Sequence, residues 1–201
     1  MSLYDACHEA GGMSAYEWER DPKRLLFILA RYQFVAKMLQ GKRSVLEIGC
    51  ADGFGSRVVR QHVGGLVAVD IEQESIDAAK RGVSARWPIT FQRHDILAYA
   101  LPYYDAVYCL DLFEHIADEE LLLTRLYSCA PVCVIGTPSL ESQKYASKLS
   151  IEGHVNCKSG EELRASCLNH WTHVFMFSAN DEVVHTGFSP MAHYLFAVCV
   201  R

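Results

Sequence analysis

The chain has 201 residues, with 19 Lys and Arg against 24 Asp and Glu, so its formal net charge is −5. Half of the residues are apolar, which is enough for a buried core, and the length suits one domain over residues 1–201. The apolar runs are short and interrupted by polar residues, which excludes a membrane-spanning segment.

The N-terminus and the cysteines indicate an intracellular protein. Residues 1–14 have neither a basic start nor an apolar stretch, so we expect no secretory signal. The eight cysteines include no CxxC pair, and we expect reduced, small apolar fillers rather than a disulfide framework. We therefore expect a cytoplasmic protein.

The order of the predicted elements begins with an irregular lead-in over residues 1–22, which are polar and contain several glycines. From Lys23 to Gln40, apolar residues recur at helical spacing, and Gly41 ends the helix. Short apolar runs and helical segments then alternate. The predicted strands are Val45–Ile48, Leu66–Val69, Ile89–Arg93, Asp105–Leu110 and Val132–Ile135, and the predicted helices are Ser56–His62, Glu72–Arg81 and Glu119–Tyr127.

This alternation predicts an α/β, Rossmann-like, doubly wound fold with a mostly parallel sheet covered by helices on both faces. The last third of the chain differs. A capping box at Ser159–Glu162 opens a helix through Leu168. Two strand-like runs, Trp171–Ser178 and Ala192–Val200, follow it, and we expect them to form a terminal antiparallel pair at the sheet edge.

The most informative stretch is a glycine-rich loop after the first predicted strand, VLEIGCADGFG at residues 45–55. Such a loop lets the backbone approach a ligand and points helix N–H groups at it. A nicotinamide dehydrogenase has GxGxxG instead, and Glu47 would repel a pyrophosphate. A ligand with an amine and a sulfonium would not be repelled.

Acidic residues also follow the next strands. Asp70 ends the second strand, where a carboxylate can accept both hydroxyls of a ribose, although it could equally cap the next helix. Asp95 follows the third strand and could accept from an adenine amino group, or serve as a turn residue. Open parallel sheets bind ligands at the carboxyl ends of their strands, so together these sites predict a nucleoside ligand.

With these motifs the sequence resembles the class I S-adenosylmethionine (SAM)-dependent methyltransferases. VLEIGCADGFGS, VAVDIEQESIDAAK, HDIL and YYDAVYCLDLFEHI are similar to four motifs of that family, in order, over about residues 40–140. The resemblance implies a seven-stranded sheet with an antiparallel last strand, and SAM as cofactor with S-adenosylhomocysteine (SAH) as product. Ala51 stands where the family more often has Gly.

The resemblance also implies a role for each residue of these motifs. Glu47 and the glycine loop would hold the methionine part of SAM, and Asp70 its ribose. Two isoleucines would enclose the adenine, Asp95 would bind its amino group, and Leu110 would lie beside the sulfonium. The full cofactor set is Glu47, Gly49, Cys50, Ala51, Asp52, Gly53, Asp70, Ile71, Asp95, Ile96 and Leu110.

Methyl transfer to a neutral hydroxyl needs a base, and His115, just after the fourth strand, and His154 are the candidates. Asp111-x-x-Glu114-His115 is also similar to the pattern of metal-dependent O-methyltransferases, in which a further His, here His154, completes a divalent-metal site. Glu-His-Ile also occurs in family members without metal, so we expect no metal and activity that survives chelation.

The substrate side is predicted from charge and from the family. Residues 20–43 carry seven basic residues against Asp21, which indicates either a solvated helix face or a site for a phosphate- or carboxylate-bearing substrate. In this family the N-terminal segment often closes over SAM. Residues 137–157 form a predicted acceptor loop. The substrate-binding candidates are Tyr16, Trp18, Arg31 and Tyr32.

The leading hypothesis is therefore a SAM-dependent methyltransferase that O-methylates a small molecule: a sugar, a nucleotide-linked sugar or a natural-product intermediate. One alternative is a metal-dependent RNA 2′-O-methyltransferase, although no basic and aromatic surface continues elsewhere in the chain to bind extended nucleic acid. Another is a catalytically idle SAM-binding partner of a different enzyme. The acceptor and the oligomeric state are not encoded in any motif.

Overall fold

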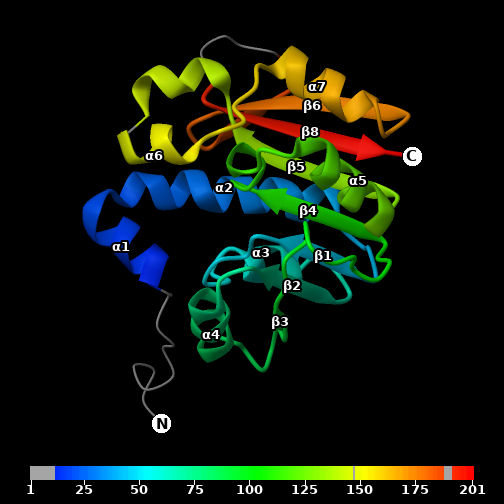
Figure 1. The fold of residues 1–201 in the computed structure, drawn as a ribbon. Coiled ribbons are helices and arrows are strands. Elements are labelled where there is room, and N and C mark those ends of the chain that lie inside the picture. Colours follow the sequence, from blue (N-terminus) through cyan, green and yellow to red (C-terminus); the bar gives the residue numbers. More distant parts are fainter. Residues whose placement is uncertain (1–11, 147, 188–191) are drawn as a thin grey trace.

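The computed structural model describes residues 12–146, 148–187 and 192–201. An eight-stranded sheet runs through the centre, in the order β3-β2-β1-β4-β5-β8-β6-β7 (Figure 1). The first five strands are parallel to one another, and β8 and β6 continue the sheet antiparallel. The strands are β1 (Val45–Ile48), β2 (Leu66–Asp70), β3 (Thr90–Arg93), β4 (Ala106–Leu110), β5 (Val132–Pro138), β6 (His173–Asn180), β7 (Val183–His185) and β8 (Tyr194–Val200).

Helices cover both faces of the sheet, as the alternating pattern predicts. On one face α2, α3 and α4 pack against the core through residues such as Phe34, Val59 and Ile76. On the other face α5 and α7 bury Leu122 and Leu163. The helices are α1 (Gly12–Arg20), α2 (Pro22–Met38), α3 (Ser56–Arg60), α4 (Gln73–Arg81), α5 (Glu119–Cys129), α6 (Lys148–Gly153) and α7 (Gly160–Leu168), with 3₁₀ turns η1 (Phe113–His115) and η2 (Leu140–Tyr145).

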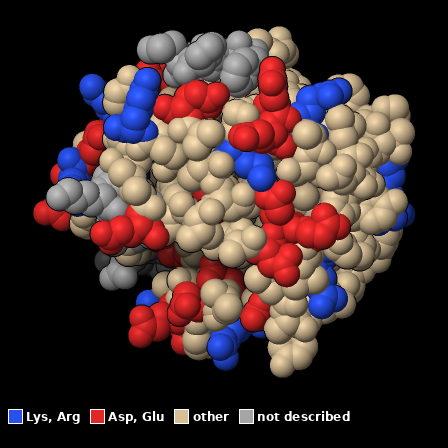
Figure 2. Space-filling view, turned by 45° about the horizontal axis from the view of Figure 1, so that its top comes forward, with Lys and Arg blue, Asp and Glu red and all other residues tan. Residues whose placement is uncertain are grey.

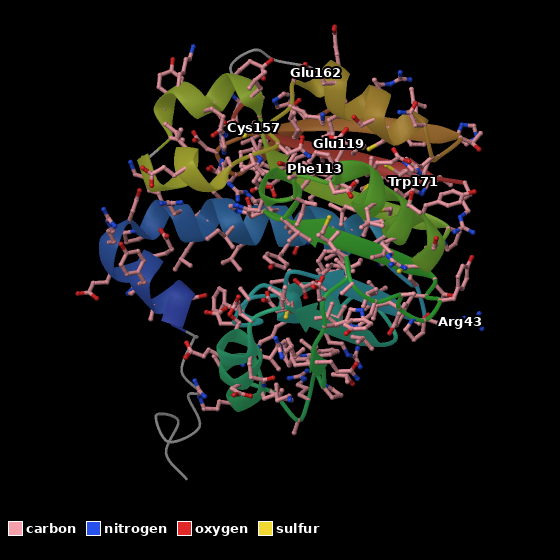
Figure 3. All side chains as sticks on the ribbon, viewed as in Figure 1. Arg43, Phe113, Glu119, Cys157, Glu162 and Trp171 are labelled. Carbon is pink, nitrogen blue, oxygen red and sulfur yellow. The ribbon has the colours of Figure 1, made fainter. Side chains whose placement is uncertain are left out.

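The helix boundaries follow local chemistry. The Asp118 side chain accepts from the Leu121 backbone N–H at the start of α5. Ser159 and Glu162 form the predicted capping box of α7, and Figure 3 shows Glu162 at that end of the helix. The α2 helix stops before Gly41, which takes a left-handed φ of 81°. Capping residues therefore set where these elements begin and end.

Three sequence-based expectations are wrong. The sheet has eight strands rather than seven, because β7 forms in the predicted connection and pairs with the last three residues of β6. Residues 12–20 are helical rather than irregular, since Ser14 and Glu17 face inward and Glu17 pairs with Arg24. Residues 137–157 are not a plain loop: they contain the end of β5, η2 and α6. Residues 1–11 of the predicted lead-in lie outside the described part of the chain.

The cysteines contribute apolar volume to the core. The seven described cysteines are free thiols, and all but Cys157 are buried. Cys109, Cys133, Cys167 and Cys199 belong to the same core cluster, with Phe113 and Trp171, on the α5 and α7 side of the sheet (Figure 3). Burial raises the pKa of the Cys133 thiol well above its ordinary value. These thiols are therefore protonated packing groups.

Candidate active site

The predicted cofactor residues gather at one edge of the sheet. Because β1 to β4 are parallel, their carboxyl ends meet there, at Ile48, Asp70, Arg93 and Leu110. The glycine loop follows β1, and Asp95 and Ile96 follow β3. The four predicted sites thus lie along one edge of the sheet, in the spatial order β3, β2, β1 and β4.

The glycine loop has the backbone conformation that its small residues permit. Gly49 and Gly53 have φ of 78° and 71°, and Ala51 has φ of 46°. The left-handed region costs a residue with a Cβ roughly 1–2 kcal/mol. The Asp70 side chain offsets this at Ala51, because it accepts from the Ala51 N–H at 2.9 Å. Alanine therefore occupies a position that glycine would adopt more easily.

Both nucleoside-binding candidates also hold the backbone. Asp70 accepts from the Glu72 N–H at 2.9 Å, and Asp95 Oδ1 accepts from the Leu97 and Ala98 N–H groups. Asp95 is therefore a turn residue, whereas Asp70 does not cap α4, whose N-cap is Glu72, but bends the backbone before it. Both roles are compatible with ligand binding because each carboxylate oxygen has two lone pairs. Ile71 is 51% exposed, whereas Ile96 is buried.

Glu47 is a buried acid of the site, with 1% exposure. Burial raises its pKa from 4.5 to about 7, and the nearby hydroxyls of Ser56, Tyr108 and Tyr32 oppose the shift. These three groups come from α3, β4 and α2. Glu47 thus lies beneath the glycine loop in a pocket of hydroxyls contributed by three elements.

Tyr32 is part of the packed wall around Glu47. Its ring meets Tyr108 edge-on, with ring centroids 6.4 Å apart. A Cβ placed at Gly55 would lie 2.1 Å from Tyr32 Cε2, so the missing side chain of Gly55 leaves the space that this ring fills. Tyr16 and Trp18 lie on α1 and are 50% and 65% exposed. The Tyr16 hydroxyl accepts a hydrogen bond from Arg20.

Arg31 is held by the loop after β4. Its Nη1 donates to both carboxylate oxygens of Asp111 at 2.8 Å, and its guanidinium lies 3.9 Å from the centre of the Tyr194 ring. Although burial lowers the pKa of Arg31, the Asp111 carboxylate raises it above its ordinary value overall. Asp111 has φ of 52°, and its N–H donates to the carbonyl of Gly136 and to the Tyr194 hydroxyl.

The basic stretch of residues 20–43 is partly neutralised by salt bridges. Arg24 pairs with Glu17, Arg31 with Asp111 and Arg43 with Asp105. On the face drawn in Figure 2, Lys and Arg side chains lie among acidic ones rather than in one patch. Salt bridges therefore account for three of the seven basic residues, which favours the interpretation as a solvated helix face.

Two histidines meet beside Glu114. The rings of His115 and His154 have centroids 5.0 Å apart. His115 Nδ1 lies 2.8 Å from the Gly153 carbonyl, and His154 Nδ1 lies 3.0 Å from Gln143 Oε1. Both oxygens are acceptors, so each neutral ring carries its proton on Nδ1 and a lone pair on Nε2. Burial and the neighbouring His115 lower the pKa of His154, which favours the neutral ring.

Glu114 completes a cluster that fits a metal ion. One ligand atom each from Glu114, His115 and His154 lies within 4.8 Å of the others, and no further such cluster exists among the described residues. Glu114 Oε2 accepts from the Thr137 hydroxyl, whereas Oε1 is buried without a partner. Burial, then the Asp111 charge, raises the pKa of Glu114 to about 8. Asp111, the fourth candidate ligand, pairs with Arg31 instead.

Sequence reasoning missed three residues that shape this site. Gln143 orients His154, Thr137 donates to Glu114, and Tyr194 supports Arg31 and Asp111. Thr137 could have been found as a polar residue near the end of a buried strand. Gln143 and Tyr194 reach the site only through the tertiary fold, from η2 and β8.

Comparison with known proteins finds a methyltransferase domain in part of the chain. A family model described as a methyltransferase domain matches residues 45–130. This range, which holds the glycine loop and the strand ends β1 to β4, is therefore similar to methyltransferase domains. The four motifs of the sequence lie within or just around the matched range of this methyltransferase domain.

The curated relatives are named ubiquinone biosynthesis O-methyltransferase. The protein from Psychrobacter arcticus is 22% identical over 137 residues, which are 64% of this chain and 53% of that protein. The protein from Coxiella burnetii is 31% identical over 88 residues, which are 42% of this chain and 37% of that protein. The chain thus spans about half or less of the length of these relatives.

Solved methyltransferase structures share the fold. The putative methyltransferase in complex with the Haloferax volcanii Trm112 activator has a TM-score of 0.70 at 17% identity, over 100% of this chain and 98% of that one. Magnesium protoporphyrin IX methyltransferase from Synechocystis PCC 6803, with bound SAH, has a TM-score of 0.62 at 16% identity, over 89% and 83%. No helix in the described ranges is long and apolar enough to cross a membrane.

Proposed function

We propose that the protein transfers the methyl group of SAM to a hydroxyl oxygen of a small-molecule acceptor. The observation that carries this proposal is the position of the His115–His154 pair, at the same carboxyl edge of the sheet as the glycine loop. The names of the curated relatives support oxygen as the acceptor atom.

The cofactor would lie across the ends of β1 to β4. The N–H groups of the glycine loop and Glu47 would face its methionine part, and Asp70 its ribose hydroxyls. Ile71, just after β2, is exposed, and an adenine ring that lay between Ile71 and Ile96 would cover it. Leu110, at the end of β4, would flank the sulfonium. Asp95 would accept from the adenine amino group.

Methyl transfer is an in-line displacement at carbon. The acceptor oxygen forms the new bond as the carbon–sulfur bond breaks, the sulfonium becomes the neutral thioether of SAH, and the hydroxyl proton must leave. Positioning the two reactants supplies much of the rate. The Nε2 lone pair of His115 or His154 accepts the proton, and the carbonyl of Gly153 and the amide of Gln143 stabilise the ring that becomes charged.

The acceptor class follows from the groups around the site. A sugar, a nucleotide-linked sugar or a natural-product intermediate offers the neutral hydroxyl that a histidine base suits. Arg31 would contact the acceptor or the cofactor from α2, with Tyr16 and Trp18 covering the site from α1. The Arg31–Asp111 pair argues against a strict need for an anionic acceptor, because the guanidinium already has a carboxylate.

A metal-dependent O-methyltransferase is the second candidate, and the Glu114, His115 and His154 cluster favours it. One carboxylate and two imidazoles suit Mn²⁺, Fe²⁺ or Zn²⁺, and the Nδ1–H bonds to oxygen resemble those that orient metal-bound histidines. The unpartnered Glu114 Oε1 fits such an ion. A bound metal would lower the pKa of the acceptor hydroxyl. An RNA 2′-hydroxyl remains an alternative acceptor for this form.

Labelled methyl from SAM, incubated with a cell extract that is then fractionated into small molecules, RNA and protein, tests the proposal. We expect label in the small-molecule fraction with and without EDTA, and its loss in His115→Ala but not in the control His62→Ala. Label in RNA that EDTA abolishes would establish the metal-dependent form. SAM binding without transfer to any fraction would establish an idle SAM-binding partner.

A further inference from the structure

One edge of the sheet is left open where β6 extends past its neighbour. The β7 strand pairs only with Ser178, Ala179 and Asn180, whereas β8 pairs with β6 from His173 to Ala179 on the other side. No other described strand pairs with residues 173–177, and no described loop hydrogen-bonds to their backbone. Alternate residues of this five-residue segment, those whose backbone groups point away from β8, are therefore unpaired at the sheet edge among the described residues.

This open edge lacks the features that usually prevent strand pairing. Residues 173–177, His-Val-Phe-Met-Phe, contain no Lys, Arg, Asp, Glu or Pro. Phe175 is 55% exposed and stacks on the exposed His173, with ring centroids 6.4 Å apart. The opposite edge, β3, is shorter and carries an exposed Arg93. The β6 segment, like the short β7 beside it (Val183–His185), thus carries no Lys, Arg, Asp, Glu or Pro, which is the composition of a strand that pairs with another chain.

A groove beside this edge extends the surface onto α7. It has a volume of about 200 Å³ and lies between the first turns of α7 and the sheet, with a mostly apolar lining that includes Met176 and Leu195. Glu161 and Arg164 stand on its α7 wall and form no described ion pair with each other or with other residues. The groove wall therefore carries one charge of each sign.

We propose that the β6 edge and the α7 groove form the interface with a second copy of this chain, related by a twofold axis. In a twofold contact the same surface meets itself, so a wall with one acid and one base can place each charge near the opposite charge of its partner. An uncharged strand can pair antiparallel with itself without like-charge repulsion. A stable dimer buries about 800 Å² on each partner, and the groove and Phe175 add to what the strand pair alone would cover.

The partner is a second copy rather than an unrelated protein because two features of this surface can each match a copy of themselves: the uncharged β6 segment, and the groove wall with one acid and one base. An unrelated partner would need neither the absence of charge along the strand nor the balanced Glu161 and Arg164 pair. The pairing would join two eight-stranded sheets into one continuous sheet. The pairing needs no residue of the His115 site, so the inference does not depend on the proposed reaction.

Mass measurement of the full chain by light scattering after size exclusion tests the proposal. We expect about 45 kDa at micromolar concentration, twice the 22.6 kDa of one chain. Phe175→Lys places a charge on the edge and should raise the dimer dissociation constant at least tenfold, with unchanged circular dichroism and SAM binding. The control Tyr99→Lys makes the same change at a site that is 68% exposed beyond β3, and should remain dimeric.

A second variant tests the groove without altering the strand. Arg164→Glu leaves two acids on each wall, and we expect weaker association that recovers partly at high salt. A wild-type mass of one chain at every concentration would overturn the proposal. So would a dimer that Phe175→Lys and Arg164→Glu leave intact, because the interface would then lie elsewhere.

Discussion

Replacing Gly55 with Ala tests whether Tyr32 is a packed wall of the site. The backbone at Gly55 is right-handed helical, with φ of −69° and ψ of −30°, so any residue can adopt it. The obstacle to a side chain is the Tyr32 ring, whose Cε2 and Cδ2 would lie 2.1 and 2.3 Å from an added Cβ. Overpacking of this kind costs about 1–3 kcal/mol.

The cost should appear in thermal unfolding. A change of 1 kcal/mol shifts Tm by about 2–4 °C in a domain of this size, so we expect Gly55→Ala to lower Tm by roughly 2–12 °C. Gly65→Ala is the matched control, because its Cβ would lie 3.5 Å from the Arg43 carbonyl, an ordinary contact. Its Tm should stay close to that of the wild type.

A double-mutant cycle assigns the cost to the ring. In a Tyr32→Ala background the space beside Gly55 is free, and Gly55→Ala should then cost less than about 0.5 kcal/mol. The coupling between the two changes should therefore exceed about 0.5 kcal/mol. Equal costs for Gly55→Ala in both backgrounds would refute the reasoning, and would mean that Gly55 is needed for its backbone or for the ligand.

Four further predictions concern charge and proton transfer. The pKa of Glu47 is about 7 in the folded state against 4.5 in the unfolded state, so the folded state binds more protons between these two pH values. As the pH rises from 4.5 to 7, the wild type should therefore lose up to about 3 kcal/mol of unfolding free energy relative to Glu47→Gln. Denaturant titrations in which both proteins show the same dependence on pH would contradict this. The lowered pKa of His154 predicts that kcat rises with pH to a midpoint below 6.5, and that this limb is lost in His154→Gln but kept in the control His62→Gln. EDTA should leave methyl transfer unchanged, whereas loss of activity with recovery in Mn²⁺ would make Glu114 a metal ligand. Arg31→Ala frees the Asp111 carboxylate and should lower kcat/KM about 5- to 30-fold, a loss of about 1–2 kcal/mol; unchanged kinetics would place Arg31 outside the site.

Much of the cofactor edge was predictable because its signals are local. A glycine loop, the acids that end consecutive strands and the α7 capping box each depend on neighbours in sequence, and the parallel sheet then brings the strand ends together. The helix over residues 12–20 was missed, because its inward-facing residues include Ser14 and Glu17, whose burial depends on contacts that the sequence pattern does not display.

The rest of the candidate site depends on long-range contacts. Asp111 looked like a metal ligand by its spacing from Glu114, but a guanidinium eighty residues away in sequence binds it. Tyr32 is a substrate-binding candidate from the sequence, and the space at Gly55, which determines where its ring lies, shows only in the fold. The β7 strand was missed because it has three residues and is stabilised by pairing with β6 rather than by its own pattern.

The rate at which the buried thiols react can report how often the sheet unfolds. Cys109, Cys133 and Cys199 have no exposed surface, and their raised pKa values keep them as thiols rather than reactive thiolates. An alkylating reagent would reach them only when the sheet opens, whereas Cys157 is partly accessible in the native state. The rate at which alkylation adds mass would therefore measure how often the β4-β5-β8 part of the sheet opens in the wild-type protein. Repeating the measurement with a bound nucleoside would show whether the ligand slows this opening.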